Sequence, residues 1–319
     1  MQVIPKPAHG SLPWLQIRHR DDEGNVTFGG SEVGALMGVS EYTTLADLCI
    51  SKLSPPEVKE PEPQMIKGLI FEDGLLKHSG TLLDLEVTTP NFMYRKGRFT
   101  VTLDGLAYEH DDYDNPQRII EAKVTSAYTV ASADDLPRSW VMQGHVQQWV
   151  VGLPVSFIVF DKRQHINLIE MPFDEALMDQ IVQVADIVGG DLDTGEIPDY
   201  AYAQMTADQV QALYPVKESR AITADDDVVN YIFDLETTRN QLKKLKDEES
   251  SLMDSIARAM GDADEVTDAN GFTMLTWRQQ KGRQSFDAKA FQSAHPDLYA
   301  QFLKEGAPFR VMRLGKGNR

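Results

Sequence analysis

The stretch IIEAKVT, residues 119–125, decides how the rest of the chain is interpreted. Its apolar and β-branched flanks predict a short, mostly buried strand. Glu121 and Lys123 lie two residues apart, so on a strand their side chains share one face and Ala122 points to the other. A buried carboxylate and a buried ammonium each cost free energy unless a partner compensates the charge. The sequence therefore predicts either a mutual ion pair or a site for a metal ion and a polarised water.

The Glu-x-Lys spacing by itself is weak, because about one such triplet is expected by chance in a chain of this length. Asp287 and Lys289 provide a second acidic-x-Lys spacing in the same chain. The neighbouring sequence distinguishes residues 121–123 from such coincidences. Upstream, RFTVTLDGLAYE (residues 98–109) alternates like a strand that ends at Asp104 and Gly105. Two adjacent strands, one ending in Asp and the next carrying Glu-x-Lys, form a one-metal or two-metal phosphodiesterase site in many nucleases.

The composition sets limits on the class of protein. With 319 residues, 42% of them hydrophobic, the chain can bury one large core or two modest ones. No apolar run is long enough to span a membrane and no export signal is visible, so we expect a cytoplasmic protein. The single cysteine, Cys49, excludes an internal disulfide and leaves a cysteine zinc site or iron–sulfur cluster without ligands. The net charge of −18 argues against a passive nucleic-acid coat but permits an enzyme whose carboxylates hold a cation.

The N-terminal third contains two features that could contact a ligand. Ser31 follows a Gly-Gly turn and has the character of an N-cap for a helix over residues 33–39, which is either an ordinary capped helix or a phosphate site. Arg18 precedes this turn. A helix is predicted over residues 44–53 and another over residues 63–80, where Glu72 lies mid-helix. Gly68, one turn before Glu72, predicts that this face approaches another backbone closely, so that Glu72 points inward.

The remainder of the first 200 residues predicts an α/β core. Strands are expected at residues 85–89, 92–95 and 99–103, and a hairpin at residues 155–160 and 166–169. Helices are expected at residues 139–151 and 173–188. On the first of these helices Gln143 and Gln147 are one turn apart and share a face, while His145 and Gln148 are rotated away.

The sequence predicts three regions: a core over residues 1–200, a linker over residues 201–224, and an extension over residues 225–319. The extension begins with one long helix, residues 225–260, in which apolar residues recur at roughly heptad spacing. This stripe either packs on its own domain or a neighbouring helix, or binds a partner helix. A small α+β segment follows it.

The order of these motifs resembles the phage lambda exonuclease family, also called the YqaJ-type viral recombinase nucleases, within the PD-(D/E)xK superfamily. The resemblance covers roughly residues 14–190. It rests on Trp14 to Arg18, Gly30 to Val33, Gly38 to Ser40, Gly68 with Glu72, Asp104-Gly105, Glu121 to Lys123, and the glutamine-rich helix WVMQGHVQQWVVG at residues 140–152. The chain differs from many relatives in having Gln143-Gly144-His145 where they have Gln-x-Gln, and residues 21–27 look inserted.

The resemblance implies a mixed central sheet flanked by helices and a site built from these residues. Asp104, Glu121, Lys123 and Gln143 would be catalytic, with Lys123 orienting or deprotonating the attacking water. Glu72, Asp104, Glu121 and the carbonyl of Ala122 would hold Mg²⁺, for which Mn²⁺ would substitute. Ser31, Arg18 and Gln147 would bind DNA, the first two at the 5′-phosphate.

The activity implied by the resemblance is 5′-to-3′ digestion of linear double-stranded DNA by a ring-shaped homotrimer, leaving 3′ single strands for recombination by a single-strand annealing protein. Two alternatives remain open at this point. One is a RecB-like or restriction-type endonuclease with the same core. The other is a non-catalytic DNA-end-binding or assembly module organised by the long helix, in which Glu121 and Lys123 are a structural ion pair.

Overall fold

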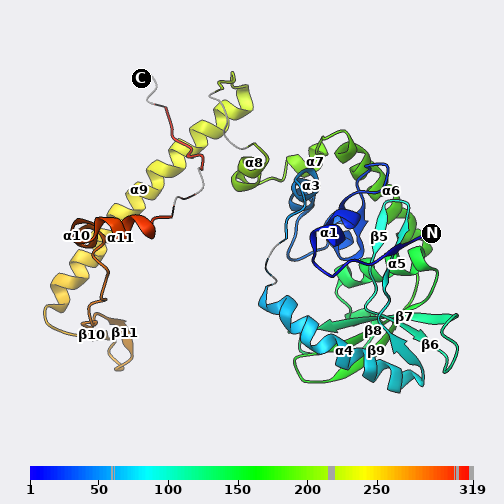
Figure 1. The fold of residues 1–319 in the computed structure, drawn as a ribbon. Helices are drawn as coiled ribbons and strands as arrows, with labels where there is room; N and C mark the ends of the chain where they lie inside the picture. Colours follow the sequence, from blue (N-terminus) through cyan, green and yellow to red (C-terminus); the bar gives the residue numbers. More distant parts are fainter. Residues whose placement is uncertain (59, 61, 215–219, 305, 307–308, 316–319) are drawn as a thin grey trace. The chain divides into compact units, whose positions relative to one another are not determined.

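The computed structural model describes residues 1–58, 60, 62–214, 220–304, 306 and 309–315. The chain divides into two compact units, Met1–Tyr214 and Pro215–Arg319, which are drawn together in Figure 1. Within the described residues, no helix is both long enough and apolar enough to cross a membrane.

The first unit is built around a five-stranded mixed sheet in the order β3-β6-β7-β8-β9. Its strands are β3 (Glu86–Thr88), β6 (Gly105–Tyr108), β7 (Pro116–Val124), β8 (Val155–Phe160) and β9 (Ile166–Met171). The central strand β7 runs antiparallel to β6 and parallel to β8, so the chain must cross over between β7 and β8. The helix α5 (Arg138–Val151) makes that crossing.

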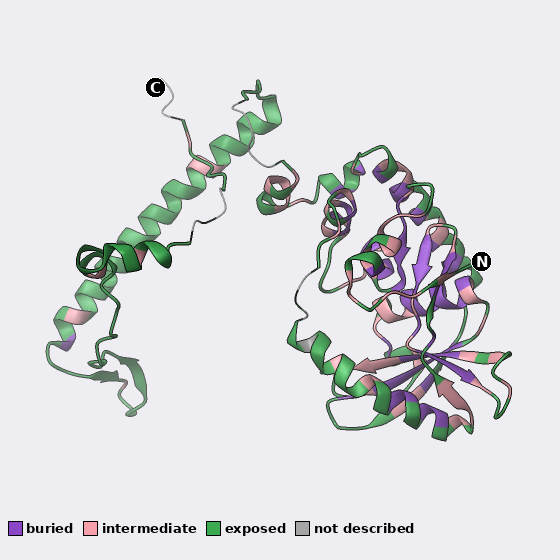
Figure 2. Ribbon diagram, viewed as in Figure 1, coloured by how far each residue is buried: buried purple, intermediate pink, exposed green. Residues whose placement is uncertain are grey.

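Two helices cover the two faces of this sheet (Figure 1). On one face, Leu75 and Leu76 of α4 (Pro63–Leu83) pack against Ile120 and Ile158. On the other, Val146 of α5 joins the larger core. Figure 2 shows the strands buried between these layers. Gly144 allows α5 to lie close to the sheet, because a Cβ there would stand 2.7 Å from the Met171 sulfur. The predicted mixed sheet flanked by helices is confirmed.

A second, four-stranded sheet packs beside the first and has the order β1-β4-β5-β2. Its strands are β1 (Gln2–Pro5), β4 (Phe92–Lys96), β5 (Phe99–Val101) and β2 (Phe28–Gly29). The remaining helical segments of this unit are α1 (Leu12–His19), the 3₁₀ turns η1 (Gly30–Glu32) and η2 (Ala133–Asp135), α2 (Val33–Leu36), α3 (Leu45–Leu53), α6 (Glu175–Asp193), α7 (Asp199–Tyr202) and α8 (Ala207–Leu213).

The strand predicted to end at Asp104-Gly105 ends earlier, and a second strand in another sheet follows it. β5 ends at Val101, and β6 starts at Gly105. Asp104 therefore stands before a strand rather than at the end of one, where the chain passes from one sheet to the other. Gly105 makes this entry possible, since a Cβ there would meet Leu76 and Val87 side-chain atoms at 2.9 Å.

The predicted linker, residues 201–224, is partly helical. α8 occupies residues 207–213, and Gln209 donates a 2.5 Å hydrogen bond to Asp47 at the start of α3. This contact between residues distant in sequence attaches α8 to the first unit. The low hydrophobicity of the segment did not predict that attachment. Residues 215–219 of the predicted linker lie outside the described residues.

The second unit consists of one long helix followed by a hairpin and two short helices. α9 (Asp226–Met260) is capped by the Asp225 side chain, which accepts from the Val228 amide, and ends at Gly261 in a positive-φ conformation. The prediction of a helix over residues 225–260 is confirmed. It is followed by β10 (Glu265–Thr267), β11 (Thr273–Thr276), α10 (Ala288–Ala294) and α11 (Pro296–Gln301).

Candidate active site

The Glu121 carboxylate is the centre of a buried polar cluster on the α5 side of β7. Glu121 is 2% exposed. Its Oε1 accepts from Lys123 Nζ at 2.7 Å and from Gln143 Nε2 at 2.5 Å, and its Oε2 accepts from Gln147 Nε2 at 2.7 Å. Glu121 and Lys123 thus share a face as the strand alternation predicts, and the Ala122 side chain packs in the cluster on the α4 side. The two glutamines of α5 both point to this carboxylate.

Asp104, just before β6, lies beside the Glu121 segment of the neighbouring strand β7. Its Oδ2 accepts a 2.9 Å hydrogen bond from the Ala122 amide, which places the aspartate next to the Glu-x-Lys strand. Burial raises the pKa of Asp104 well above its usual range, and the charge of Glu121 raises it further. The charge of Lys123 and the hydrogen bond from the Ala122 amide both lower the pKa of Asp104, but the net pKa is still raised. The site therefore carries more negative charge than its own cations compensate.

Glu72 brings a third carboxyl from helix α4. It is half-buried, and its pKa is raised first by burial and then by the charge of Glu121. The expected inward direction of Glu72 is seen, but the reason given by the sequence is wrong. A Cβ on Gly68 would meet nothing within 4 Å, so no backbone approaches that glycine closely.

Lys123 is a charged ammonium in this arrangement. Burial by itself would lower its pKa, but the carboxylates of Glu121 and Asp104 outweigh burial, and the net pKa is raised. Its Nζ also donates to Gln143 Oε1 at 3.1 Å. A raised pKa does not suit the expected role of deprotonating a water, whereas a fixed positive charge suits the role of orienting one.

Arg18 and Ser31 meet in the lining of the pocket that these carboxyls also line. Arg18 Nη2 donates to Ser31 Oγ at 2.9 Å, and the guanidinium lies 4.3 Å from the centre of the Trp14 ring. Arg18 Nε is buried and has no hydrogen-bond partner among the described residues. A Cβ on Gly29 would stand 2.0 Å from Arg18 Nη2, so a side chain here would displace the guanidinium from this position. A guanidinium beside an exposed hydroxyl is suited to binding a phosphate.

Ser31 is not the N-cap that the sequence predicts. It lies inside the 3₁₀ turn η1. The Gly29 amide instead donates a 2.6 Å hydrogen bond to Glu32 Oε2. The longer Glu32 side chain reaches back over the turn, which leaves the Ser31 hydroxyl available to Arg18. The helix after it, α2, is shorter than the predicted residues 33–39.

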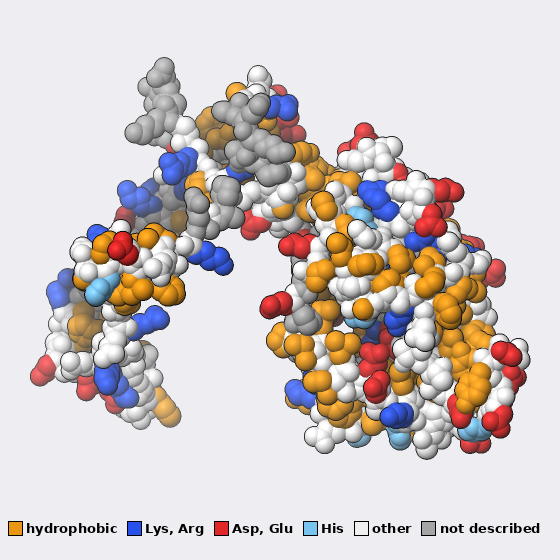
Figure 3. All heavy atoms as spheres, viewed as in Figure 1, with side chains coloured by type: hydrophobic (Ala, Val, Ile, Leu, Met, Phe, Trp, Pro, Cys, Tyr) orange, Lys and Arg blue, Asp and Glu red, His pale blue; other side chains and the backbone are white. Residues whose placement is uncertain are grey.

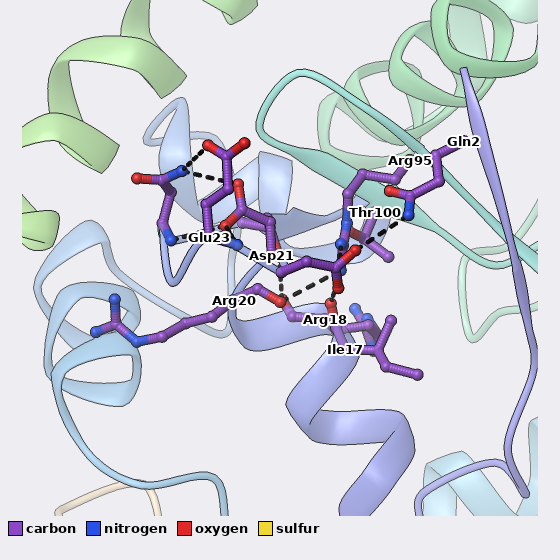
Figure 4. A network of polar contacts seen from close by, with 11 residues as sticks. Gln2, Ile17, Arg18, Arg20, Asp21, Glu23, Arg95 and Thr100 are labelled. Carbon is purple, nitrogen blue, oxygen red and sulfur yellow. Dashed lines mark hydrogen bonds and ion pairs between the residues drawn. The ribbon is translucent and has the colours of Figure 1, made fainter.

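The segment that looks inserted, residues 21–27, does not displace Arg18. Figure 4 shows the polar contacts that hold it. Asp21 accepts from the Asn25 amide at 2.8 Å, which closes the turn. Arg95 donates from Nη2 to the carbonyls of Ile17, at 2.7 Å, and Arg20, at 3.2 Å. The last turn of α1 is therefore fixed to β4, and the inserted residues form a turn beyond it.

A buried ion pair behind Arg18 was not anticipated from the sequence. Lys52 is 2% exposed, and its Nζ lies 2.8 Å from Glu32 Oε2 and donates to the Arg18 carbonyl at 3.1 Å. Burial would raise the pKa of Glu32, but the charges of Lys52 and Arg18 outweigh it and lower that pKa. The available signal was a lone lysine between Ile50 and Leu53 in an apolar helix, a pattern that solvated lysines share.

One pocket of about 360 Å³ joins these groups. It lies between α1 and α4, and the hollow is visible in Figure 3, where acidic side chains gather near basic ones. Its lining includes Arg18, Ser31, Glu72, Asp104, Glu121, Ala122, Lys123 and Gln143. Gln147 does not line the pocket and contacts it through Glu121. The structure thus brings the sequence-predicted residues to one place.

The oxygen atoms around this pocket are of the kind that the predicted metal would need. Carboxylate oxygens and a nearby carbonyl are the donors that Mg²⁺ prefers, and the raised pKa values of Asp104 and Glu72 mark negative charge that a cation would offset. The donor chemistry therefore fits. Among the described residues, however, no three His, Cys, Asp or Glu side chains converge closely enough to hold a metal ion. Glu121 is engaged by the amine and both amides instead.

Residues 13–154, a little less than half of the chain, match the family model of the YqaJ-like viral recombinase domain. The match includes every residue of the cluster from Arg18 to Gln147. It confirms the resemblance inferred from the sequence motifs.

Comparison with solved structures finds similar chains at low sequence identity. An alkaline exonuclease from Laribacter hongkongensis is 15% identical, with a TM-score of 0.45, over 58% of this chain and 94% of that one. A phage-related exonuclease from Haemophilus somnus is 14% identical, with a TM-score of 0.42, over 53% of this chain and 95% of that one. No curated protein sequence matches the chain.

The raised pKa of Asp104 predicts a pH-dependent stability in the presence of a chelator. Folding favours the protonated carboxyl, so the folded state is penalised above the folded pKa and relieved as the pH falls through it. Asp104→Asn should therefore be more stable than the parent at neutral pH, and the gain should vanish in the usual Asp range. Thermal unfolding between pH 4 and 8 measures this. A gain that is constant with pH would contradict the assigned cause.

The Lys52–Glu32 pair predicts a strong coupling energy. Lys52→Met leaves Glu32 without its cation and should cost about 3 kcal/mol of unfolding free energy. The double variant with Glu32→Gln should cost clearly less than the sum of the two single variants. Lys77→Met, at an exposed lysine of α4, is the control and should change stability by less than about 0.5 kcal/mol. Urea denaturation gives the four values, and additive costs would show that the pair is not coupled.

Proposed function

We propose that the chain is a Mg²⁺-dependent exonuclease that digests linear double-stranded DNA from the 5′ end. The observation that carries the proposal is a single pocket lined by Asp104, Glu121 and Lys123 and also by Arg18 and Ser31. The first group suits phosphodiester hydrolysis and the second suits a terminal phosphate. The family match supports the same activity.

Hydrolysis of a phosphodiester needs charge neutralisation at the phosphoryl oxygens and a positioned water. Bound Mg²⁺ would supply Lewis acidity and lower the pKa of a water; Asp104, Glu121, Glu72 and the Ala122 carbonyl are the residues that would hold it. Lys123 presents its ammonium to the pocket and neutralises phosphoryl charge. Gln143 and Gln147 hold the Glu121 carboxylate in one orientation through amide hydrogen bonds.

Arg18 and Ser31 would bind the 5′-phosphate. The guanidinium has five N–H donors, and Trp14 covers one of its faces, which limits its hydration and its freedom. The buried Lys52 holds the Arg18 carbonyl from behind. With a chain charge of −18, DNA affinity must come from such local cations rather than from the overall field.

The biological setting that we infer is phage-type recombination in the cytoplasm of a bacterial host. The 3′ single strand left by digestion would pass to a single-strand annealing protein. Three chains would form a ring around the DNA. The family match is what supports these assignments.

The activity is tested with linear and covalently closed duplex DNA, in Mg²⁺ and in chelator. The parent should digest the linear duplex only, and only with the cation. Glu121→Gln and Lys123→Ala should each lower the rate by at least about 10²-fold, the usual cost of losing one such group. Lys77→Ala serves as the matched surface control. Nicking of closed circles would favour an endonuclease, and a parent-like rate in either site variant would refute the site.

The phosphate assignment is tested by comparing 5′-phosphorylated with 5′-hydroxyl ends. Arg18→Met and Ser31→Ala should lower kcat/KM on phosphorylated ends by about 10- to 100-fold, because a hydrogen bond to a charged group contributes about 1.5–3 kcal/mol. Their rates on hydroxyl ends should stay near that of the parent. Equal losses on both ends would place Arg18 and Ser31 outside the phosphate site.

A further inference from the structure

The long helix α9 carries an apolar stripe that its own unit leaves open. The stripe follows a heptad repeat in which the first and fourth positions are mostly apolar. Its members are Val228, Tyr231, Leu235, Leu242, Leu245 and Leu252. Figure 2 shows α9 exposed along nearly its whole length, and Leu242, Leu245 and Leu252 are 52%, 61% and 58% exposed. Three leucines on one face, each more than half exposed, are unusual for a helix without a partner.

The hairpin that follows α9 covers only the end of this stripe. Met260 is buried, and it lines a pocket together with Ile256, Leu275 and Trp277 of the same unit. The stripe from Val228 to Leu252 lies outside that pocket. Its length, 25 residues, gives more than three heptads, enough for a coiled coil.

The charges beside the stripe indicate which partner fits. On one flank, the positions before the first heptad residues hold Asp227, Asp234, Gln241 and Glu248, so the charged residues there are all acidic. On the other flank, the positions after the fourth heptad residues hold Ile232, Arg239, Lys246 and Met253, so the charged residues there are both basic. In a parallel pair of identical helices the acidic flank of one faces the basic flank of the other. In an antiparallel pair each flank faces its own kind and is repelled.

We propose that α9 forms a parallel, in-register coiled coil with α9 of another copy of this chain. Asp234 of one helix then faces Arg239 of the other, and Gln241 faces Lys246. Thr238 and Glu249 interrupt the apolar positions; paired polar residues there cost stability and penalise shifted registers. None of the α9 residues named here lines the nuclease pocket. The outcome of the tests below therefore does not bear on the proposed activity.

Disulfide trapping in the full-length chain tests the register. Val228→Cys sits at a first heptad position near the start of α9 and should cross-link between copies under mild oxidation. Asn230→Cys, two residues away on the outer face, is the matched control and should cross-link at least several-fold less. The native Cys49 does not compete, because it is buried and burial raises its pKa to about 11.

The same trapping distinguishes parallel from antiparallel helices. An antiparallel arrangement would separate the two Val228 positions by about 40 Å at 1.5 Å per residue. It would instead cross-link Val228→Cys with Leu252→Cys, at the far end of the stripe, in a mixture of the two variants. That mixed product, or equal trapping at Val228→Cys and Asn230→Cys, would overturn the proposal. So would no trapping at all, as expected if the chain's first unit covers the stripe.

Charge reversal tests the pairing on non-reducing gels of the Val228→Cys chain. Asp234→Arg and Arg239→Asp should each lower the cross-linked fraction several-fold, since each places like charges opposite one another. The chain that carries both reversals restores opposite charges and should recover the parent fraction. A double variant no better than the singles would overturn the assigned pairing.

Discussion

A carboxylate buried on the central strand of the five-stranded sheet organises the first unit. Glu121 is nearly inaccessible to water, so its charge must be met by the donors around it. Lys123 comes from the same strand, and Gln143 and Gln147 come from the helix that crosses over it. Strand β7 and helix α5 are thereby fixed to each other by polar contacts as well as by the apolar core. Changes on either element alter the site.

The single negative charge of the Glu121 carboxylate explains why one lysine and two glutamines donate to it. One ammonium gives charge, while two amides give hydrogen bonds without adding further positive charge. Asp104 and Glu72 stand near the same point, and their raised pKa values reflect a site that is short of cations. A protein that needed only stability would gain from apolar residues here. Retaining such a costly arrangement fits a site that binds a cation and a phosphate.

Much of this arrangement was predictable because it depends on local periodicity. The two-residue period put Glu121 and Lys123 on one face, and the helical period put Gln143 and Gln147 on one side of α5. The features that the sequence did not predict depend on contacts between residues distant in the chain. The break before Gly105 follows from a second sheet, and the Lys52–Glu32 pair follows from the packing of α3 behind α1. The capping role of Glu32 in place of Ser31 could have been predicted, because a glutamate three residues after the cap often accepts from the backbone amide of the cap residue, here Gly29.

The break at Asp104 has a consequence for where a strand would be cut. Ser31 follows β2, which pairs with β5 in the four-stranded sheet, whereas Glu121 belongs to the five-stranded sheet. The residues between β5 and β6, 102–104, are the covalent link between these two platforms. Under the function proposed above, a 5′-phosphate would bind on one side of this connection and the scissile bond would lie on the other. The length of the connection would then contribute to the size of the released product.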